Sequence, residues 1–260
     1  MNLRLAAESL ALATAVTLLS PAIAGAWVAV SAATEEPFAS TGIDAPETPL
    51  VEQWRSVWGK IQSGFAALSH CGAQPGRCSA AASIRFQKIL ESARAHDRFV
   101  KLAIINAGVN AAIRYAGIQQ GRLEYPWSSA AAMFTSRRGA CTEFAIAKYM
   151  ALLQSDCPAN DIRLVLTWPD GANEPHMVLA ARYEGRWYIL DNLRSAILTD
   201  ARLENYVPLF VLDHLGVRKL VPEFIPTDSP ARDARASAYR RRMISSGLRN
   251  NEPRQDGETP

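Results

Sequence analysis

A cysteine in this chain stands where it could act as a nucleophile. Cys141 follows Gly139-Ala140 and opens a segment, residues 141–154, that is predicted to be a helix. A thiol attacks a carbonyl only as the thiolate. The N-terminus of a helix carries partial positive charge and free N–H groups, which favour the thiolate and can also bind an oxyanion. Cys141 is therefore the candidate nucleophile for acyl chemistry.

Two runs of β-forming residues predict a hairpin that begins next to a histidine, His176. The runs are residues 177–183 and 186–190, and Glu184-Gly185 between them is typical of a two-residue turn. This turn pairs the two residues that flank it and so sets the register of the hairpin. A slip of one residue would move every side chain to the other face.

The predicted register brings Asp191 to His176. Asp191 comes opposite Val178, and Val178 shares a face with His176 because side chains alternate along a strand. Asp191 is then the diagonal neighbour of His176, at roughly 7–8 Å between backbone positions. An aspartate that holds an imidazole in one tautomer completes a triad. The predicted catalytic residues are Cys141, His176 and Asp191; the alternative is a buried cysteine, a surface histidine and a turn aspartate.

Helices must precede this hairpin. Thr48 as N-cap and Pro49 at the first helical position predict a helix. Its apolar residues recur at helical spacing: Trp54, Val57, Trp58, Ile61, Phe65 and Leu68. Two more helices are predicted at about 79–96 and 98–115, followed by a loop over 116–138. In the third helix Asn106 and Asn110 share a face, and a structural link to a neighbouring loop is preferred over a catalytic role.

The later part of the chain changes to strands. Residues 162–167 are β-rich, and two further short strands are predicted near Ile197 and over 209–212. Helices followed by an antiparallel sheet indicate an α+β fold. Residues 27–47 are predicted to be a linker, 48–226 the domain, and 227–260 a peripheral, partly disordered tail. A net charge of +3 without a basic run interleaved with aromatics does not indicate nucleic-acid binding.

The first 26 residues are expected to be a secretory signal peptide. Arg4 precedes an apolar run over 10–19, and Ala22-Ile23-Ala24 is a small-x-small cleavage pattern. The alternative is a membrane anchor, for which the run is short. Export implies the periplasm, where Cys71 and Cys78 are disulfide candidates across turn-forming residues. Two free thiols are the alternative, and Cys157 is expected to be a buried small hydrophobe.

Several motifs in order resemble those of the bacterial transglutaminase-like cysteine peptidases, the LapG-like periplasmic adhesin proteases. The family pattern Gly-Asp-Cys-Glu-Asp-Tyr-Ala-Ile-Ala-Lys-Tyr is similar to residues 139–149. His-x-Val-Leu and Leu-Asp-Asn match residues 176–179 and 190–192. Further motifs match Asn106 to Asn110, Trp127 and Tyr206-Val207-Pro208. The resemblance spans roughly residues 54–217.

The resemblance implies a papain/transglutaminase-like fold, with the nucleophile helix packed on an antiparallel sheet. It implies hydrolysis of a peptide bond through a thioester acyl-enzyme, with Trp127 as a substrate-binding residue. It further implies a protein substrate such as a large surface adhesin, and an inner-membrane receptor for cyclic di-GMP as a partner. A non-catalytic binding module on this fold and acyl transfer to amines are the alternative functions.

One departure from the family pattern concerns calcium. The acidic residues that flank the cysteine in LapG-like members and bind calcium are Ala140 and Thr142 here, and an aspartate after the third helix is replaced by Ile118. Calcium needs several oxygen ligands, carboxylates above all. We therefore expect no metal and no cofactor in this chain.

Overall fold

The computed structural model describes residues 36–69, 80–117, 127–128 and 130–222, together with the single residues 237 and 241. The predicted signal peptide, the Cys71–Cys78 pair, Ile118 and almost all of the tail lie outside the described residues. Export, the disulfide and the nature of the tail therefore stay predictions.

The described residues contain five α-helices. They are α1 (Pro49–Ser69), α2 (Ala80–Arg94), α3 (Arg98–Ala112), α4 (Ala130–Ser136) and α5 (Cys141–Gln154). Helix α5 has the bounds that the sequence predicts. Thr48 Oγ1 accepts a hydrogen bond from Val51 N at 3.4 Å, which confirms the predicted cap of α1. Asp97 caps α3 in the same way, through the N–H groups of residues 99 and 100.

Two helix predictions are wrong. Residues 116–138 were expected to be a loop, but they contain helix α4. This helix forms because its apolar residues pack into the core. Phe134 of α4 is fully buried, and its ring lies 5.1 Å from that of Phe86 on α2. Helix α3 ends at Ala112 rather than near Tyr115. Arg114 and Tyr115 instead form strand β2 (Arg114–Tyr115), which pairs in parallel with β3 (Arg138–Gly139).

The described residues also form a seven-stranded antiparallel sheet, in the order β1-β9-β8-β4-β5-β6-β7, of which β1 precedes the helices and the other strands follow them. Its strands are β1 (Ser40–Asp44), β4 (Ile162–Pro169), β5 (His176–Tyr183), β6 (Arg186–Leu190), β7 (Leu198–Thr199), β8 (Tyr206–Asp213) and β9 (Gly216–Pro222). Strand β9 was not predicted. The linker prediction is wrong for residues 40–44, since β1 pairs with β9 along its whole length. This segment shows no periodic pattern of apolar residues, and it forms a strand because a strand distant in the sequence hydrogen-bonds to it.

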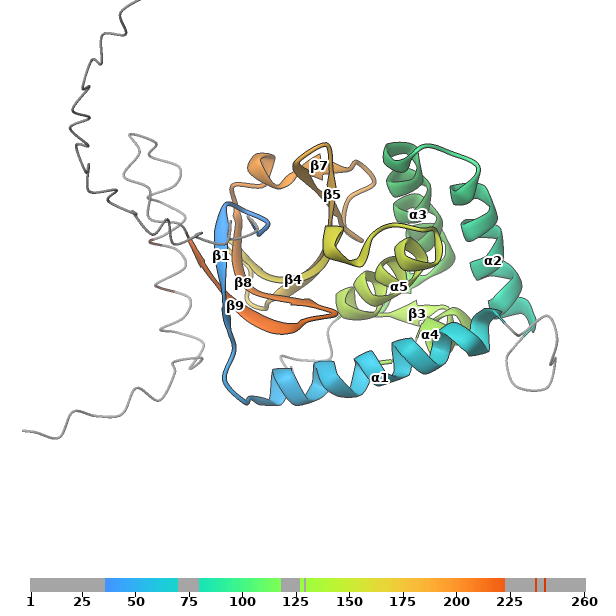
Figure 1. Ribbon diagram of the computed structural model, residues 1–260, viewed down its shortest axis with the longest axis horizontal. Coiled ribbons are helices and arrows are strands. Elements are labelled where there is room, and N and C mark those ends of the chain that lie inside the picture. Colours follow the sequence, from blue (N-terminus) through green and yellow to red (C-terminus); the bar gives the residue numbers. More distant parts are fainter. Residues whose placement is uncertain are drawn as a thin grey trace, which may run out of the picture. The chain divides into compact units, whose positions relative to one another are not determined.

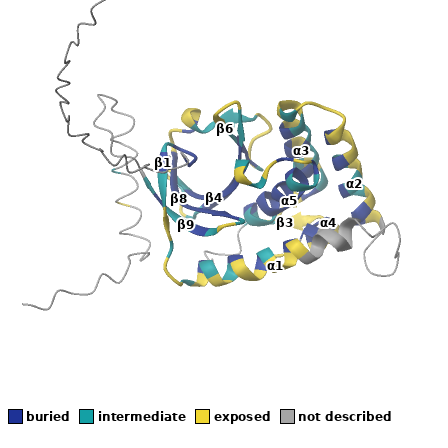
Figure 2. Cartoon of the chain, viewed as in Figure 1, coloured by how far each residue is buried: buried dark blue, intermediate teal, exposed yellow. Residues whose placement is uncertain are grey.

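Helix α5 lies between the sheet and helices α2 and α3 (Figure 1). It contacts β5 and β4 on one side and the other helices on the other. Figure 2 shows that α5 and the middle strands are buried, and the residues from Phe144 to Leu152 all are. The predicted α+β class, with the Cys141 helix packed on an antiparallel sheet, is confirmed.

The predicted hairpin register is confirmed. Tyr183 pairs with Arg186 and Leu179 with Leu190. The turn residues Glu184 and Gly185 have φ values of 48° and 73°. Positive φ at both central residues is the geometry of a two-residue turn whose twist matches that of the strands.

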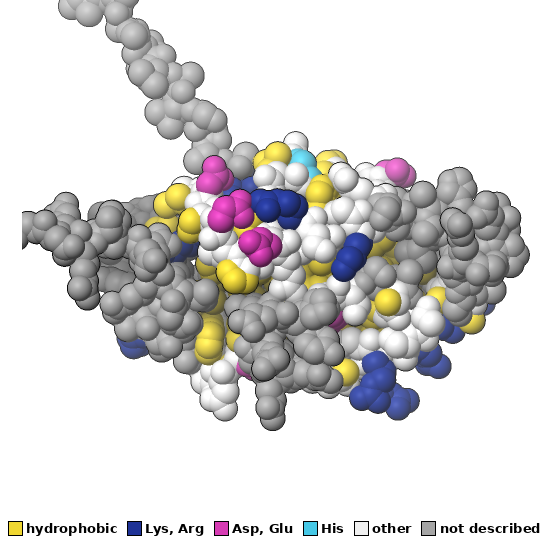
Figure 3. Space-filling view, turned by 90° about the horizontal axis from the view of Figure 1, so that it is seen from below, with side chains coloured by type: hydrophobic (Ala, Val, Ile, Leu, Met, Phe, Trp, Pro, Cys, Tyr) yellow, Lys and Arg dark blue, Asp and Glu magenta, His cyan; other side chains and the backbone are white. Residues whose placement is uncertain are grey.

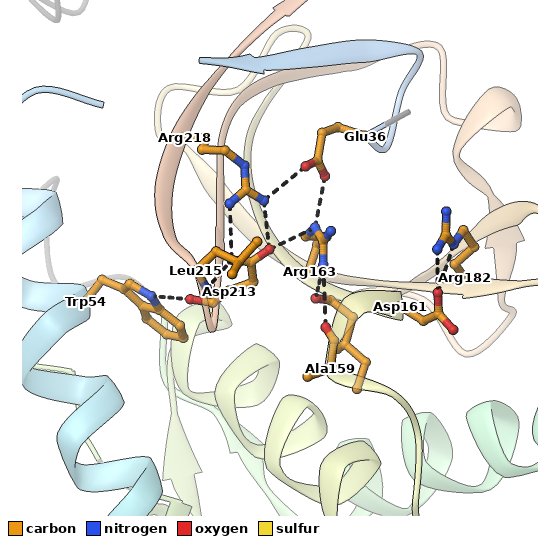
Figure 4. A network of polar contacts seen from close by, with 10 residues as sticks. Glu36, Trp54, Ala159, Asp161, Arg163, Arg182, Asp213, Leu215 and Arg218 are labelled. Atoms are coloured by element: carbon orange, nitrogen blue, oxygen red, sulfur yellow. Dashed lines mark hydrogen bonds and ion pairs between the residues drawn. The ribbon is translucent and has the colours of Figure 1, made fainter. Parts of the chain in front are cut away.

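The sheet is tied together on one side by a buried network of four charged residues (Figure 4). Arg163 Nε lies 2.9 Å from Glu36 Oε2 and 3.0 Å from Asp213 Oδ2. Arg218 Nη2 lies 3.0 Å from Glu36 Oε1 and 2.7 Å from Asp213 Oδ2. The two cations balance the two carboxylates. The network joins the segment before β1 to strands β4, β8 and β9.

The exposed surface carries a different kind of ion pair. Seen from below, acidic and basic side chains lie beside one another on the surface (Figure 3). One exposed pair joins Arg55 Nη2 to Glu47 Oε1 at 2.8 Å, an arrangement that contributes about 0–1 kcal/mol. In the described part of the chain, no helix is long and apolar enough to cross a membrane.

Candidate active site

Cys141 is the first residue of α5 and is 2% exposed. Its Sγ accepts a hydrogen bond from Met177 N, at 3.5 Å, on the neighbouring strand β5. The first N–H groups of a helix have no acceptor within the helix, so the thiol lies where the field of α5 favours negative charge. The structure therefore places Cys141 at the N-terminus of a helix, as the sequence predicts.

The turn before Cys141 is built from the backbone and from one carboxylate. The N-cap, Ala140, has no side-chain oxygen, but its N–H donates to Glu143 Oε2 at 2.9 Å. Glu143 Oε1 accepts from Ser128 N at 3.2 Å. At Gly139 a Cβ atom would come 3.1 Å from Glu143 Cβ and from Met133 Sδ. A larger residue at position 139 would require these side chains to shift by a few tenths of an ångström, so the close approach to α5 favours glycine.

His176 and Asp191 lie side by side, as the hairpin register predicts. His176 Nε2 is 2.8 Å from Asp191 Oδ1, and the two residues are 5% and 1% exposed. A carboxylate oxygen is an acceptor, so Nε2 carries a proton in this pair. The other ring nitrogen, Nδ1, is left to face Cys141. The structure thus brings the three predicted residues together from α5, β5 and the end of β6.

The electrostatics of the pair favour its charged form. Burial alone would lower the pKa of His176, but its hydrogen bonds to Asp191 and to Cys141 raise it to about 9. Burial would raise the pKa of Asp191, but hydrogen bonds, first that to His176, lower it to about 2. An imidazolium–carboxylate pair therefore faces the thiol at neutral pH.

Asp191 is held by more groups than the sequence pattern identified. Its Oδ1 accepts from Leu193 N at 2.9 Å, and its Oδ2 accepts from the hydroxyl of Tyr206 at 2.7 Å. Its main-chain carbonyl accepts from Asn110 Nδ2 at 2.9 Å. The Tyr206-Val207-Pro208 motif was the only signal in the sequence that pointed to Tyr206.

The two asparagines of α3 link this helix to the loop after β6. Asn106 Nδ2 lies 3.4 Å from Arg194 O and 3.3 Å from Ser195 O, while Asn110 bonds to Asp191 O. The structural link expected from their shared helix face is confirmed. Since one of its partners is Asp191, the link also helps to position the carboxylate beside His176.

Two aromatic residues lie near the first turn of α5. Trp127 is 6% exposed and belongs to the main core cluster, so its predicted role as a substrate contact stays a prediction. Tyr115 was expected in a helix and was not singled out. It lies opposite Gly139, is 42% exposed, and its ring is 6.5 Å from that of Phe144. Burial, and next the charge of Cys141, raise its pKa.

Comparisons with solved structures return LapG from Legionella pneumophila. Calcium-bound LapG shares 21% identity with this chain, over 73% of this chain and 98% of that chain, with a TM-score of 0.49. EGTA-treated LapG shares 20% identity over 75% of this chain and 100% of that chain, with a TM-score of 0.48. No curated protein sequence matches the chain.

A comparison with models of protein-family sequences identifies the family of this chain. The model described as bacterial transglutaminase-like cysteine proteinase matches residues 59–206, which is more than half of the 260 residues. The matched range holds Cys141, His176 and Asp191; it begins within α1 and ends at the first residue of β8. The chain is therefore a transglutaminase-like cysteine peptidase and belongs to the family of bacterial transglutaminase-like cysteine proteinases.

Proposed function

We propose that the protein is a cysteine endopeptidase with Cys141 as nucleophile, His176 as general base and acid, and Asp191 as the orienting group. The observation that carries this proposal is the buried 2.8 Å contact between His176 and Asp191, next to a thiol at the start of a helix. The raised pKa of His176 supports it, because an imidazolium stabilises a neighbouring thiolate.

The reaction follows from these positions. The Cys141 thiolate attacks the carbonyl carbon of the peptide bond, and the N-terminal N–H groups of α5 stabilise the oxyanion. The carbon–nitrogen bond breaks as the His176 imidazolium gives its proton to the leaving amine, and a thioester remains. His176 then takes a proton from water, which attacks the thioester and releases the acid. The Cys141 thiolate and the His176 imidazolium are restored together.

The substrate of such a peptidase is a protein. The identity of that substrate, the regulator and the cellular location are part of the proposal. From the family resemblance we propose a surface adhesin as substrate, a cyclic di-GMP receptor as regulator, and the periplasm as location. Expression with a candidate adhesin should give an adhesin fragment that disappears when Cys141 is replaced by alanine. N-terminal sequencing should find that the exported protein begins after Ala24 or Ala26. An intact adhesin, or a retained leader, would count against these parts.

The triad is tested by the reactivity of its thiol. Iodoacetamide at neutral pH should modify Cys141 about 100-fold faster than Cys157, because only Cys141 faces an imidazolium. Both cysteines are free and buried, and burial raises the pKa of Cys157, so Cys157 is an internal reference. Peptide mapping by mass spectrometry measures both rates. Equal, slow rates at the two positions would overturn the proposal.

Calcium is expected to have no effect on stability. Calcium would need carboxylates beside Cys141, and positions 140 and 142 hold Ala and Thr. The remaining carboxylate, Glu143, already accepts hydrogen bonds from two main-chain N–H groups. A ligand that binds only the folded state raises Tm, so Tm should be the same in micromolar calcium and in EGTA.

A matched variant shows that this calcium test can respond. Ala140→Asp combined with Thr142→Glu places carboxylates where the family pattern has them, and its Tm should rise with calcium. A rise of several degrees in the unaltered protein would contradict the prediction.

A further inference from the structure

A buried lysine lies on the nucleophile helix. Lys148 of α5 is 0% exposed, and no carboxylate of the described residues forms an ion pair with it. Its Nζ donates to the main-chain carbonyl of Leu190 at 3.5 Å and lies 5.9 Å from the ring centroid of Phe144. A weak hydrogen bond and an aromatic face are modest compensation for a buried ammonium.

The buried position of Lys148 opposes its charge. Burial penalises the charged form and lowers the pKa of Lys148 to about 7, while the charge of Asp191 opposes that shift. A methionine would fill the same unbranched volume without that penalty, and replacing buried charges by apolar groups is often neutral or stabilising. The presence of a lysine at this buried position is therefore not explained by its contribution to stability.

The position of Lys148 relative to Cys141 supplies an explanation. The two residues are seven apart on α5, so they lie on one face of the helix, two turns from each other. Cys141 Sγ meets Met177 N, beside His176 on β5. Lys148 Nζ meets the carbonyl of Leu190, which directly precedes Asp191 at the end of β6. One helix face therefore contacts both strands that carry the rest of the site.

The main chain at Asp191 is held from two helices. The carbonyl of Leu190 accepts from Lys148 on α5, and the carbonyl of Asp191 accepts from Asn110 on α3. Both hydrogen bonds act on the main chain directly beside the Cα atom that carries the Asp191 side chain. That side chain then reaches His176 and Tyr206.

We propose that Lys148 is a positioning residue, which fixes the Leu190–Asp191 main chain against α5 and so keeps the carboxylate directed at His176. The inference rests on the proposed triad. It extends that triad by a residue that does not contact substrate and acts only through Asp191.

The test compares Lys148→Met with Lys101→Met in the full protein. Lys148→Met should lower the rate of Cys141 alkylation by iodoacetamide, and kcat for any peptide substrate, about 10-fold, with KM and Tm not lowered. Lys101 is the matched control, because its Nζ also donates to a main-chain carbonyl, that of Ser155, next to the opposite end of α5. Lys101→Met should leave the alkylation rate unchanged.

A third variant separates positioning from folding. Lys148→Arg keeps a cationic donor and should restore part of the alkylation rate. If Lys148→Met reacts as fast as the unaltered protein, the inference is overturned and the triad stands. If Lys148→Met loses Tm together with reactivity, and Lys148→Arg is equally slow, the role is structural and the inference is again overturned. Slow alkylation of the unaltered protein would overturn the triad itself.

Discussion

Replacing Asp191 by alanine should lower kcat/KM on the order of 10⁴-fold, the size of the loss in kcat found when the aspartate of a serine triad is replaced. The change leaves two buried donors, His176 Nε2 and the Tyr206 hydroxyl, and the part-buried Leu193 N without their acceptor. It also removes the charge that keeps His176 protonated against the effect of burial. Steady-state kinetics on a peptide substrate measure the loss, and circular dichroism checks the fold.

Asp191→Asn separates the charge from the orientation. The asparagine oxygen can still accept from His176, while Tyr206 can turn its hydroxyl to accept from the amide. With no carboxylate, the hydrogen bond to an anion and the charge that raise the pKa of His176 are lost, so this pKa falls from about 9 toward its ordinary 6.5.

The pH profile of kcat/KM then reports the charge. In the unaltered protein the rate should fall as pH rises through about 9, where the imidazolium loses its proton. In Asp191→Asn this alkaline limb should move to lower pH, and the loss at the optimum should be smaller than in Asp191→Ala. An unmoved limb, or an alanine variant with nearly full activity, would show that Asp191 is not part of the machinery.

Arg163→Met should destabilise the protein by about 3–5 kcal/mol, because it leaves two buried carboxylates, those of Glu36 and Asp213, with the single cation of Arg218. Arg163 is 3% exposed, contacts Glu36 and Asp213, and its guanidinium lies 5.6 Å from the ring of Trp187. For a domain of this size, each kcal/mol shifts Tm by about 2–4 °C. A fall in Tm on the order of 10 °C is therefore expected in a thermal melt.

Two further variants identify the cause of that fall. Arg55→Met removes an exposed pair of similar length, that with Glu47, and should change the stability by less than about 1 kcal/mol. Arg163→Met combined with Glu36→Gln restores the balance of one cation and one carboxylate, and should recover part of the loss. Equal effects of Arg163→Met and Arg55→Met would show that burial of the network adds nothing.

Local rules were enough to predict the arrangement of those parts of the site that lie close together in the sequence. The Glu184-Gly185 turn fixes which residues pair, so the facing of His176 and Asp191 followed from alternation along two short strands. Helix α5 begins and ends where its sequence indicates, since most of its residues favour a helix and are buried in it. These features depend on residues within about one element of each other.

Other features depend on contacts that no local pattern contains. Strand β1 forms because β9 offers it an edge, and α4 forms because Phe134 packs on Phe86. The sequence analysis assigned no separate role to Lys148, yet the packing of α5 against the hairpin buries this lysine completely. Tyr206 and Asn110 reach Asp191 from 15 and 81 residues away.

The sequence by itself therefore determined the fold class, the three side chains proposed to be catalytic and the register that brings two of them together. The tertiary structure decided which groups hold Asp191 in place, and it decided where α5 lies against the sheet. The physical reason is the distance along the sequence over which each effect acts. Turn type and side-chain alternation act between near neighbours in the sequence. Burial and the hydrogen bonds around Asp191 form only when α3, α5 and β8 are packed together in the folded protein.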